Sequence, residues 1–157
     1  MNVLAEKEGK IYGAVTIDRP GDFASPVPGG LFPFLIWDHG SRFTDQERSA
    51  VARALLDSGC RYAVCGGECC EAWHDAVDTK FVKQHLNHPE ASLDAVHVMT
   101  TWHDGESSDD VGFFFVLNTN FDVHDFQQYL VLHVATGKAM EHVEAAVRKY
   151  ALNEKAV

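Results

Sequence analysis

Short runs of apolar residues alternate along most of the chain with longer segments in which apolar residues recur every three or four positions. The short runs predict β-strands that are buried on both faces, and the longer segments predict amphipathic helices. The predicted strands cover residues 11–17, 32–37, 61–65, 94–101 and 128–135. The predicted helices cover residues 44–58, 69–86, 107–118 and 138–152.

Local signals define some of these elements more sharply than others. Thr44 and Glu47 have the spacing of a capping box, and Gly59 can adopt the left-handed conformation that ends a helix. Residues 107–118 are ambiguous, because their Phe and Val content suits a strand whereas their Ser-x-x-Asp start suits a helix. We assign a helix there, since a parallel strand at 128–135 needs a crossover of about a dozen residues or more.

The alternation of strands and helices predicts an α/β fold. We expect a three-layer sandwich, flavodoxin-like or Rossmann-like, with a mainly parallel sheet of four or five strands and helices on both faces. Residues 1–157 are expected to form a single α/β domain. In this interpretation residues 1–30 supply an N-terminal edge strand and a linker rich in Pro and Gly, and residues 31–157 supply the regular β/α alternation.

The net charge of the chain favours some kinds of binding partner over others. The formal net charge is −10, with 23 acidic and 13 basic residues. Such a surface repels nucleic-acid phosphates and anionic membranes, so we expect neither as a partner and favour a basic protein instead. No apolar stretch approaches the roughly 18 residues of a membrane span, and residues 1–10 do not resemble a signal peptide. We therefore expect a soluble, cytoplasmic protein whose cysteines are free thiols.

Polar loops follow three of the predicted strands. In an open parallel sheet, the loops after the strands meet at one edge, and ligands bind there. We therefore predict that these loops form a ligand pocket. Its predicted residues are Asp38, His39, Arg42, Gly66, Gly67, His103 and Asp104.

Two cysteines stand at the turn between a predicted strand and a predicted helix. Helix-end amides can lower the pKa of a thiol, and Cys70 shares a helical face with His74, which could act as its base. The candidate catalytic residues are therefore Cys69, Cys70, His74 and Glu68. The alternative is that these cysteines are small buried core residues, and the spacing of a nucleophile elbow is absent.

A metal-dependent hydrolase that uses His39 and His103 is a second alternative. No recognised metal-binding spacing occurs, so we assign no metal site, and the Gly-rich turn lacks the spacing of a phosphate-binding loop. His97 and His133 are expected to pack inside strands with one ring nitrogen hydrogen-bonded. Because no catalytic constellation is complete, the sequence favours a small acidic non-catalytic protein-interaction or regulatory module. The sequence leaves the cofactor and the oligomeric state unknown.

Overall fold

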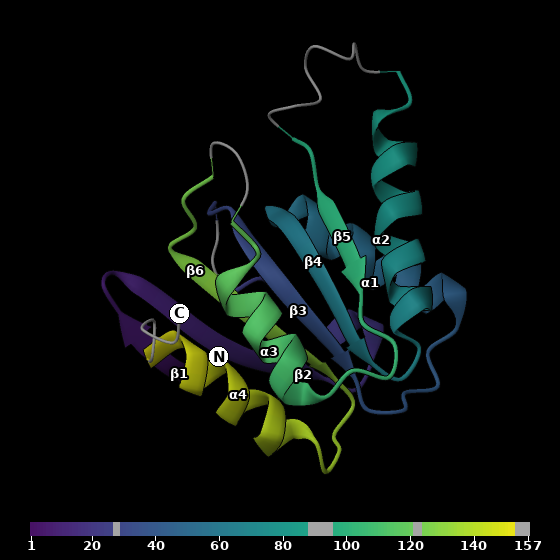
Figure 1. Cartoon of the computed structure of the whole chain (residues 1–157). Coiled ribbons are helices and arrows are strands. Elements are labelled where there is room, and N and C mark those ends of the chain that lie inside the picture. Colours follow the sequence, from purple (N-terminus) through teal and green to yellow (C-terminus); the bar gives the residue numbers. More distant parts are fainter. Residues whose placement is uncertain (27–28, 88–95, 121–123, 153–157) are drawn as a thin grey trace.

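The computed structural model describes residues 1–26, 29–87, 96–120 and 124–152 (Figure 1). These residues form an α/β structure with one six-stranded sheet and four α-helices. The strands are β1 (Asn2–Lys7), β2 (Lys10–Ile17), β3 (Phe32–Asp38), β4 (Cys60–Gly67), β5 (Met99–Trp102) and β6 (Gln128–Val134). The helices are α1 (Asp45–Asp57), α2 (Cys70–His85), α3 (Ser108–Leu117) and α4 (Met140–Leu152), and a short 3-10 helix covers Pro20–Asp22.

The sheet is mainly parallel, as the alternating pattern predicts. Its strand order is β1-β2-β6-β3-β4-β5, and each neighbouring pair is parallel except β1 with β2. The last strand in the chain, β6, therefore lies between β2 and β3. This order differs from the 2-1-3-4-5 order of flavodoxin-like folds and from the 3-2-1-4-5-6 order of Rossmann folds.

Helices cover both faces of the sheet (Figure 1). The side chains of Phe34 and Ile36 share one core with α1 and α2, whereas Leu35 and Trp37 share the other core with α3 and α4. This alternation follows from the two-residue period of a strand. Every residue of β3 is buried, as its continuous apolar run predicts for an internal strand. Within the described residues, no helix has the length and apolar character needed to cross a membrane.

The helix signals read from the sequence are confirmed. Thr44 and Glu47 form the expected capping box at the start of α1, and Gly59 has a φ of 109° just beyond its end. Residues 108–117 form the helix α3 rather than a strand. Close packing of α3 on α4 explains the glycine at position 112, because a Cβ there would lie 2.7 Å from the Ala146 Cβ of α4.

The N-terminal part of the sheet differs from the prediction. The prediction of four or five strands is wrong, since β1 adds a sixth and forms a hairpin with β2. The hairpin turn has positive φ at both Glu8 (52°) and Gly9 (83°), as a type I′ turn requires, and Glu rarely adopts this conformation. The predicted strand 94–101 is also shorter, because β5 begins at Met99 and His97 is exposed ahead of it, while residues 94 and 95 lie outside the described part.

Candidate functional site

The loops after β3, β4, β5 and β6 line one open pocket at the carboxyl edge of the sheet, with a volume of about 470 Å³. We call it the loop pocket. It lies where the strand order reverses in the sheet, because β4 is the neighbour of β3 on one side and β6 is its neighbour on the other side. The lining residues are Trp37, Asp38, His39, Gly67, Glu68, Cys69, His103, Asp104, Gly105, Glu106, Gly137, Lys138 and Ala139.

The structure brings most of the residues selected from the sequence to this pocket. Those that line it are Asp38, His39, Gly67, Glu68, Cys69, His103 and Asp104. Arg42, Gly66, Cys70 and His74 are not among the lining residues. The structure therefore brings groups from four loops to one pocket, but the pocket does not include the whole set of predicted side chains.

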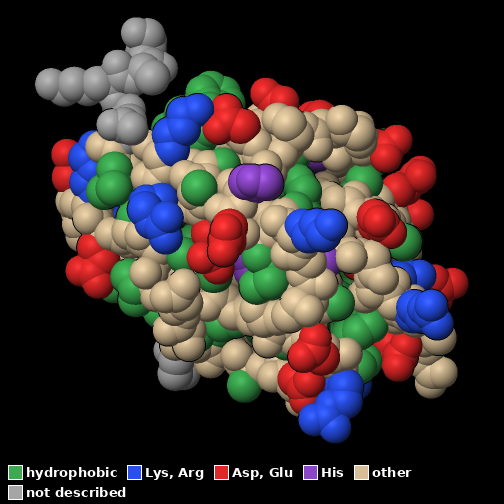
Figure 2. All heavy atoms as spheres, turned by 90° about the horizontal axis from the view of Figure 1, so that it is seen from below, with side chains coloured by type: hydrophobic (Ala, Val, Ile, Leu, Met, Phe, Trp, Pro, Cys, Tyr) green, Lys and Arg blue, Asp and Glu red, His purple; other side chains and the backbone are tan. Residues whose placement is uncertain are grey.

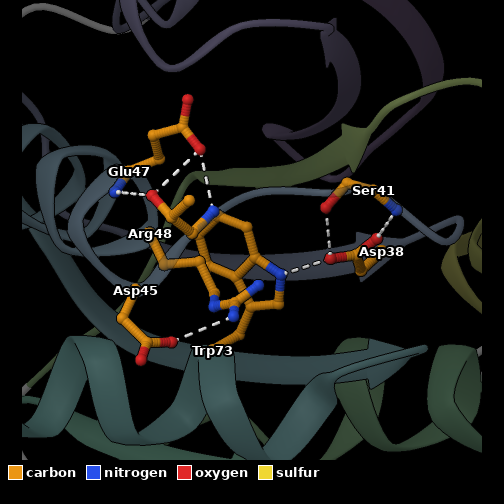
Figure 3. Close-up of polar contacts among 7 residues, drawn as sticks. Asp38, Ser41, Asp45, Glu47, Arg48 and Trp73 are labelled. Carbon is orange, nitrogen blue, oxygen red and sulfur yellow. Dashed lines mark hydrogen bonds and ion pairs between the residues drawn. The ribbon is translucent and has the colours of Figure 1, made fainter.

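Asp38 holds the first of these loops in place (Figure 3). Its side chain is 1% exposed, and its carboxylate accepts hydrogen bonds from the backbone amides of Gly40 (2.9 Å) and Ser41 (2.6 Å). It also accepts from the Ser41 hydroxyl at 2.7 Å and from the Trp73 indole Nε1 at 2.7 Å. Asp38 thus ties the loop after β3 to helix α2, and these four bonds provide the partners that a buried carboxylate requires.

Two glycines allow β4 to pass close to β3 at the pocket. Gly67 has a φ of 75°, and a Cβ there would clash with the Asp38 carbonyl oxygen and lie 2.9 Å from Trp37 Nε1. A Cβ at Gly66 would lie 2.8 Å from the Trp37 ring, so this glycine makes room for the indole. The two glycines selected from the sequence therefore shape the pocket wall.

The two adjacent cysteines have different surroundings. Cys69 is exposed at the N-cap of α2 with a φ of 54°, and its side chain makes no cap hydrogen bond. Cys70 is 3% exposed, and burial raises the pKa of its thiol, which makes it a poor nucleophile. His74 Nδ1 lies 3.0 Å from an Asp75 carboxylate oxygen, and its ring packs on Trp102 with centroids 4.5 Å apart.

His103 is held by partners on both sides of its ring. Its Nδ1 lies 2.9 Å from Glu106 Oε2, and its Nε2 lies 3.2 Å from Thr101 Oγ1. The ring is 7% exposed and packs on Phe114 with centroids 4.6 Å apart. Because a carboxylate can only accept, Nδ1 carries the hydrogen in this pair, and Nε2 of a neutral ring accepts from the Thr101 hydroxyl. The imidazole orientation is therefore fixed at the pocket.

His39 contacts a second histidine that the sequence analysis placed inside a strand. Its Nε2 lies 2.9 Å from Nδ1 of His133, which is 0% exposed within β6. Burial, followed by repulsion from His39, lowers the pKa of His133 to about 4. Burial also lowers the pKa of His39, opposed by the carboxylate of Asp38. The Glu144 Oε1 atom of α4 lies 3.5 Å from the other ring nitrogen of His133, Nε2.

The loop pocket carries more negative than positive charge. Four of its lining residues are acidic and one, Lys138, is basic. Figure 2 views the molecule from the end at which β3, β4 and β5 finish, and both acidic side chains and histidines reach this surface. Within the described ranges, no group of three or more His, Cys, Asp or Glu side chains is placed to hold a metal ion. The side-chain atoms of Asp38 and His103 that could ligate a metal already take part in hydrogen bonds.

Sequence reasoning did not select Glu106, Lys138, Glu144 or the His133 pairing. One signal for His133 was present, because it is a polar residue in an otherwise apolar internal strand and such a group needs a buried partner. Glu106 stands three residues after His103 in the same loop, which is the spacing of a local side-chain pair. No comparable signal identifies Glu144, whose position depends on how α4 packs on the sheet.

Comparison with known proteins gives a family but no function. Residues 20–150 match the model of a family described as a domain of unknown function, DUF7684. The matched segment includes every residue that lines the loop pocket. No curated protein and no solved structure matches the chain.

Proposed function

The chain belongs to the DUF7684 family of unknown function, and we propose from its own geometry that it binds a small, positively charged polar molecule in the loop pocket. The observation that carries this proposal is the convergence of four loops on one pocket where strand order reverses. Ligands of open α/β sheets bind at this place in the fold. The volume of about 470 Å³ also falls in the range of small-molecule sites, roughly 300–1,000 Å³.

The charge of the lining determines the proposed class of ligand. Glu68, Asp104 and Glu106 add carboxylates to the buried Asp38, whereas Lys138 supplies one ammonium group. The helices α2, α3 and α4 begin at this edge, and each helix N-terminus contributes roughly half a positive charge. These partial charges do not balance the carboxylates, so an ammonium or guanidinium group is favoured and a phosphate is disfavoured.

A matched set of four-carbon probes tests the charge preference. Putrescine carries two ammonium groups, butanediol is neutral, and succinate carries two carboxylates. We expect putrescine to cause saturable changes in the amide NMR signals of the pocket loops, with weaker changes for butanediol and none for succinate. Equal binding of succinate, or no saturable change with putrescine, would contradict the proposal.

Two variants separate a site from general attraction to an acidic protein. Glu68→Gln and Asp104→Asn each remove one carboxylate of the lining, and each is expected to weaken putrescine binding by about two- to fivefold, the worth of one exposed ion pair. The matched control is Glu71→Gln, because Glu71 is exposed in the first turn of α2 and does not line the pocket. Equal weakening by all three variants would indicate that only the overall charge attracts the probe.

A basic protein partner is the second candidate, and exposed side chains on β5 favour it. Met99 and Trp102 are 37% and 49% exposed on this strand, which ends the strand order of the sheet. An exposed strand edge can pair with an extended segment of a partner, and the net charge of −10 would attract a basic one. A partner of this kind should dissociate as salt increases and should bind the Trp102→Ser variant more weakly. Binding that is insensitive to both changes would argue against this function.

A further inference from the structure

A groove between α1 and α2 lies apart from the loop pocket, and its charge is of the opposite sign. Both helices cover the same face of the sheet, and the groove between them has a volume of about 370 Å³. It shares no lining residue with the loop pocket. Three basic side chains line it (Arg48, Lys80 and Lys83) against two acidic ones (Asp45 and Asp75). The groove is therefore a local excess of positive charge on a chain with a net charge of −10.

Arg48 is a largely buried charge with an incomplete set of partners (Figure 3). Its side chain is 12% exposed, and its Nη2 donates to Asp45 Oδ1 at 3.0 Å. Asp45 is 97% exposed, so water competes for its carboxylate and the pair neutralises Arg48 only weakly. The Nε of Arg48 is buried and has no hydrogen-bond partner within the described residues. Because a charge removed from water requires a partner, an anion beside the guanidinium in the groove would stabilise it.

Lys80 and Lys83 are cations without carboxylate partners. In the described part of the chain, neither forms an ion pair or a side-chain hydrogen bond. Carboxylates are plentiful, since the chain has 23 acidic and 13 basic residues, and a more exposed cation such as Arg53 does pair with Asp57. The two lysines lie three residues apart on one face of α2, about 4.5 Å along its axis. Both ammonium groups can therefore contact one anion in the groove.

The remaining polar groups of the groove are arranged along its length. Ser49 of α1 and Thr79 of α2 line it with hydroxyl groups that have no hydrogen-bond partner among the residues described. Asp45 begins α1 and Asp75 lies in the first half of α2, whereas the lysines lie in the second half of α2. Since both helices start at the carboxyl edge of the sheet, the carboxylates gather toward one end of the groove and the ammonium groups toward the other.

We propose that this groove binds a small phosphate ester of a polyol. The cationic groups of Arg48, Lys80 and Lys83 hold the phosphate, which has three oxygens and about two negative charges to match them. The carboxylates of Asp45 and Asp75 accept hydrogen bonds from hydroxyl groups of the polyol. The volume of about 370 Å³ falls in the range of small-molecule sites, roughly 300–1,000 Å³, and exceeds what a phosphate ion alone would fill.

The net negative charge of the chain is compatible with an anion at this place. Exposed charges farther apart than about 8 Å are largely screened at physiological salt, so distant carboxylates act weakly on a phosphate that contacts three cations. The two carboxylates of the groove, Asp45 and Asp75, are 97% and 69% exposed, so water weakens their repulsion. Asp75 also lies 3.0 Å from Nδ1 of His74, which occupies one of its oxygens. The local cations therefore determine the preference of the groove.

Three probes with a three-carbon skeleton test the proposal on the full-length protein. Glycerol 3-phosphate carries the phosphate, glycerate carries a carboxylate in its place, and glycerol is neutral. We expect glycerol 3-phosphate to cause saturable changes in the amide NMR signals of α1 and α2, with weaker changes for glycerate and none for glycerol. Inorganic phosphate should bind more weakly than the ester, because it lacks a polyol. The absence of a saturable change with glycerol 3-phosphate, or equally tight binding of inorganic phosphate, would overturn the proposal.

Two lysine variants locate the site. Lys80→Gln and Lys83→Gln are each expected to weaken the binding of glycerol 3-phosphate by about two- to fivefold, and the double variant by roughly tenfold, since each removes one surface ion pair with the ligand. The matched control is Arg53→Gln, because Arg53 is 66% exposed on α1 and does not line the groove. Equal weakening by the control would show attraction to any cation and would overturn the site. This proposal and that for the loop pocket fail separately, because putrescine is followed by the signals of the pocket loops.

Discussion

Acidification should destabilise the protein through His133. This ring has a folded-state pKa of about 4, against 6.5 for a free imidazole. Between these values the unfolded chain binds a proton that the folded chain does not bind, so the free energy of unfolding falls as the pH falls. The contribution is fully present above the unfolded pKa and is lost progressively below it. With these two pKa values, the loss between about pH 7 and about pH 4.5 is roughly 2–3 kcal/mol.

Urea denaturation followed by tryptophan fluorescence measures this loss across the same pH range. The His133→Asn variant lacks the titrating ring, so its unfolding free energy should fall less than that of the wild type, by about 2 kcal/mol over the range. His142→Asn, an exposed substitution on α4, should keep the wild-type dependence. The carboxyl groups of Asp22 and Asp109 have pKa values lowered below 3.8, so their effect appears at more acidic pH.

Parallel curves for the wild type and His133→Asn between about pH 7 and pH 4.5 would refute the reasoning, since they would show that burial does not exclude a proton from this ring. An NMR titration gives a direct second measurement. The ring signals of His133 should remain those of neutral imidazole at about pH 5.

Trp73→Phe should lower the free energy of unfolding by about 2–4 kcal/mol in urea denaturation, because Asp38 loses a donor at a fully buried position; an unchanged stability would show that this bond contributes nothing. Gly67→Ala should lower the free energy of unfolding by at least about 2 kcal/mol, whereas Gly105→Ala should lower it by only about 1 kcal/mol. Both glycines have positive φ, but a Cβ at Gly67 would clash with Asp38, whereas a Cβ at Gly105 meets nothing within 4 Å. Equal losses of stability in the two variants would show that the clash at residue 67 contributes nothing. Ellman's reagent should modify one thiol, Cys69, in the native protein and all four after unfolding, and rapid modification of a second native thiol would contradict the burial of the others.

Much of the layered fold follows from local sequence patterns. The continuous apolar run at residues 32–37 identifies an internal strand, and the spacing of Thr44 and Glu47 identifies the start of a helix. Each of these signals depends on residues only a few positions apart. The ambiguous segment 107–118 was assigned from the length that a parallel crossover needs, and this argument from topology was correct.

The strand order and the first strand could not be predicted in the same way. Residues 2–7 form a short strand with charged residues, and its turn places Glu8 in a left-handed conformation that sequence rules assign to Gly or Asn. The position of β6 between β2 and β3 depends on the packing of distant segments. Short-range patterns contain no information on such neighbours.

The sequence predicts the position of the candidate site in the fold better than it predicts what each side chain does there. Strand ends identify the edge at which Asp38, Glu68 and His103 gather. The sequence does not show which thiol is buried, because Cys69 and Cys70 are adjacent at the start of a helix. Only the structure shows that Cys70 is buried and Cys69 is exposed. The pairing of His39 with His133 spans 94 residues and becomes visible only when β3 and β6 lie side by side.

The central position of β6 has a consequence for protein synthesis. The N-terminal hairpin joins the rest of the sheet only through β6 within the described residues, yet this strand leaves the ribosome after the other five strands of the sheet. Until residues 128–134 emerge, the inner edges of β2 and β3 have no strand between them. The nascent chain therefore cannot complete its sheet until β6 is available, and unpaired apolar strands are the kind of surface that makes incomplete folds prone to aggregation.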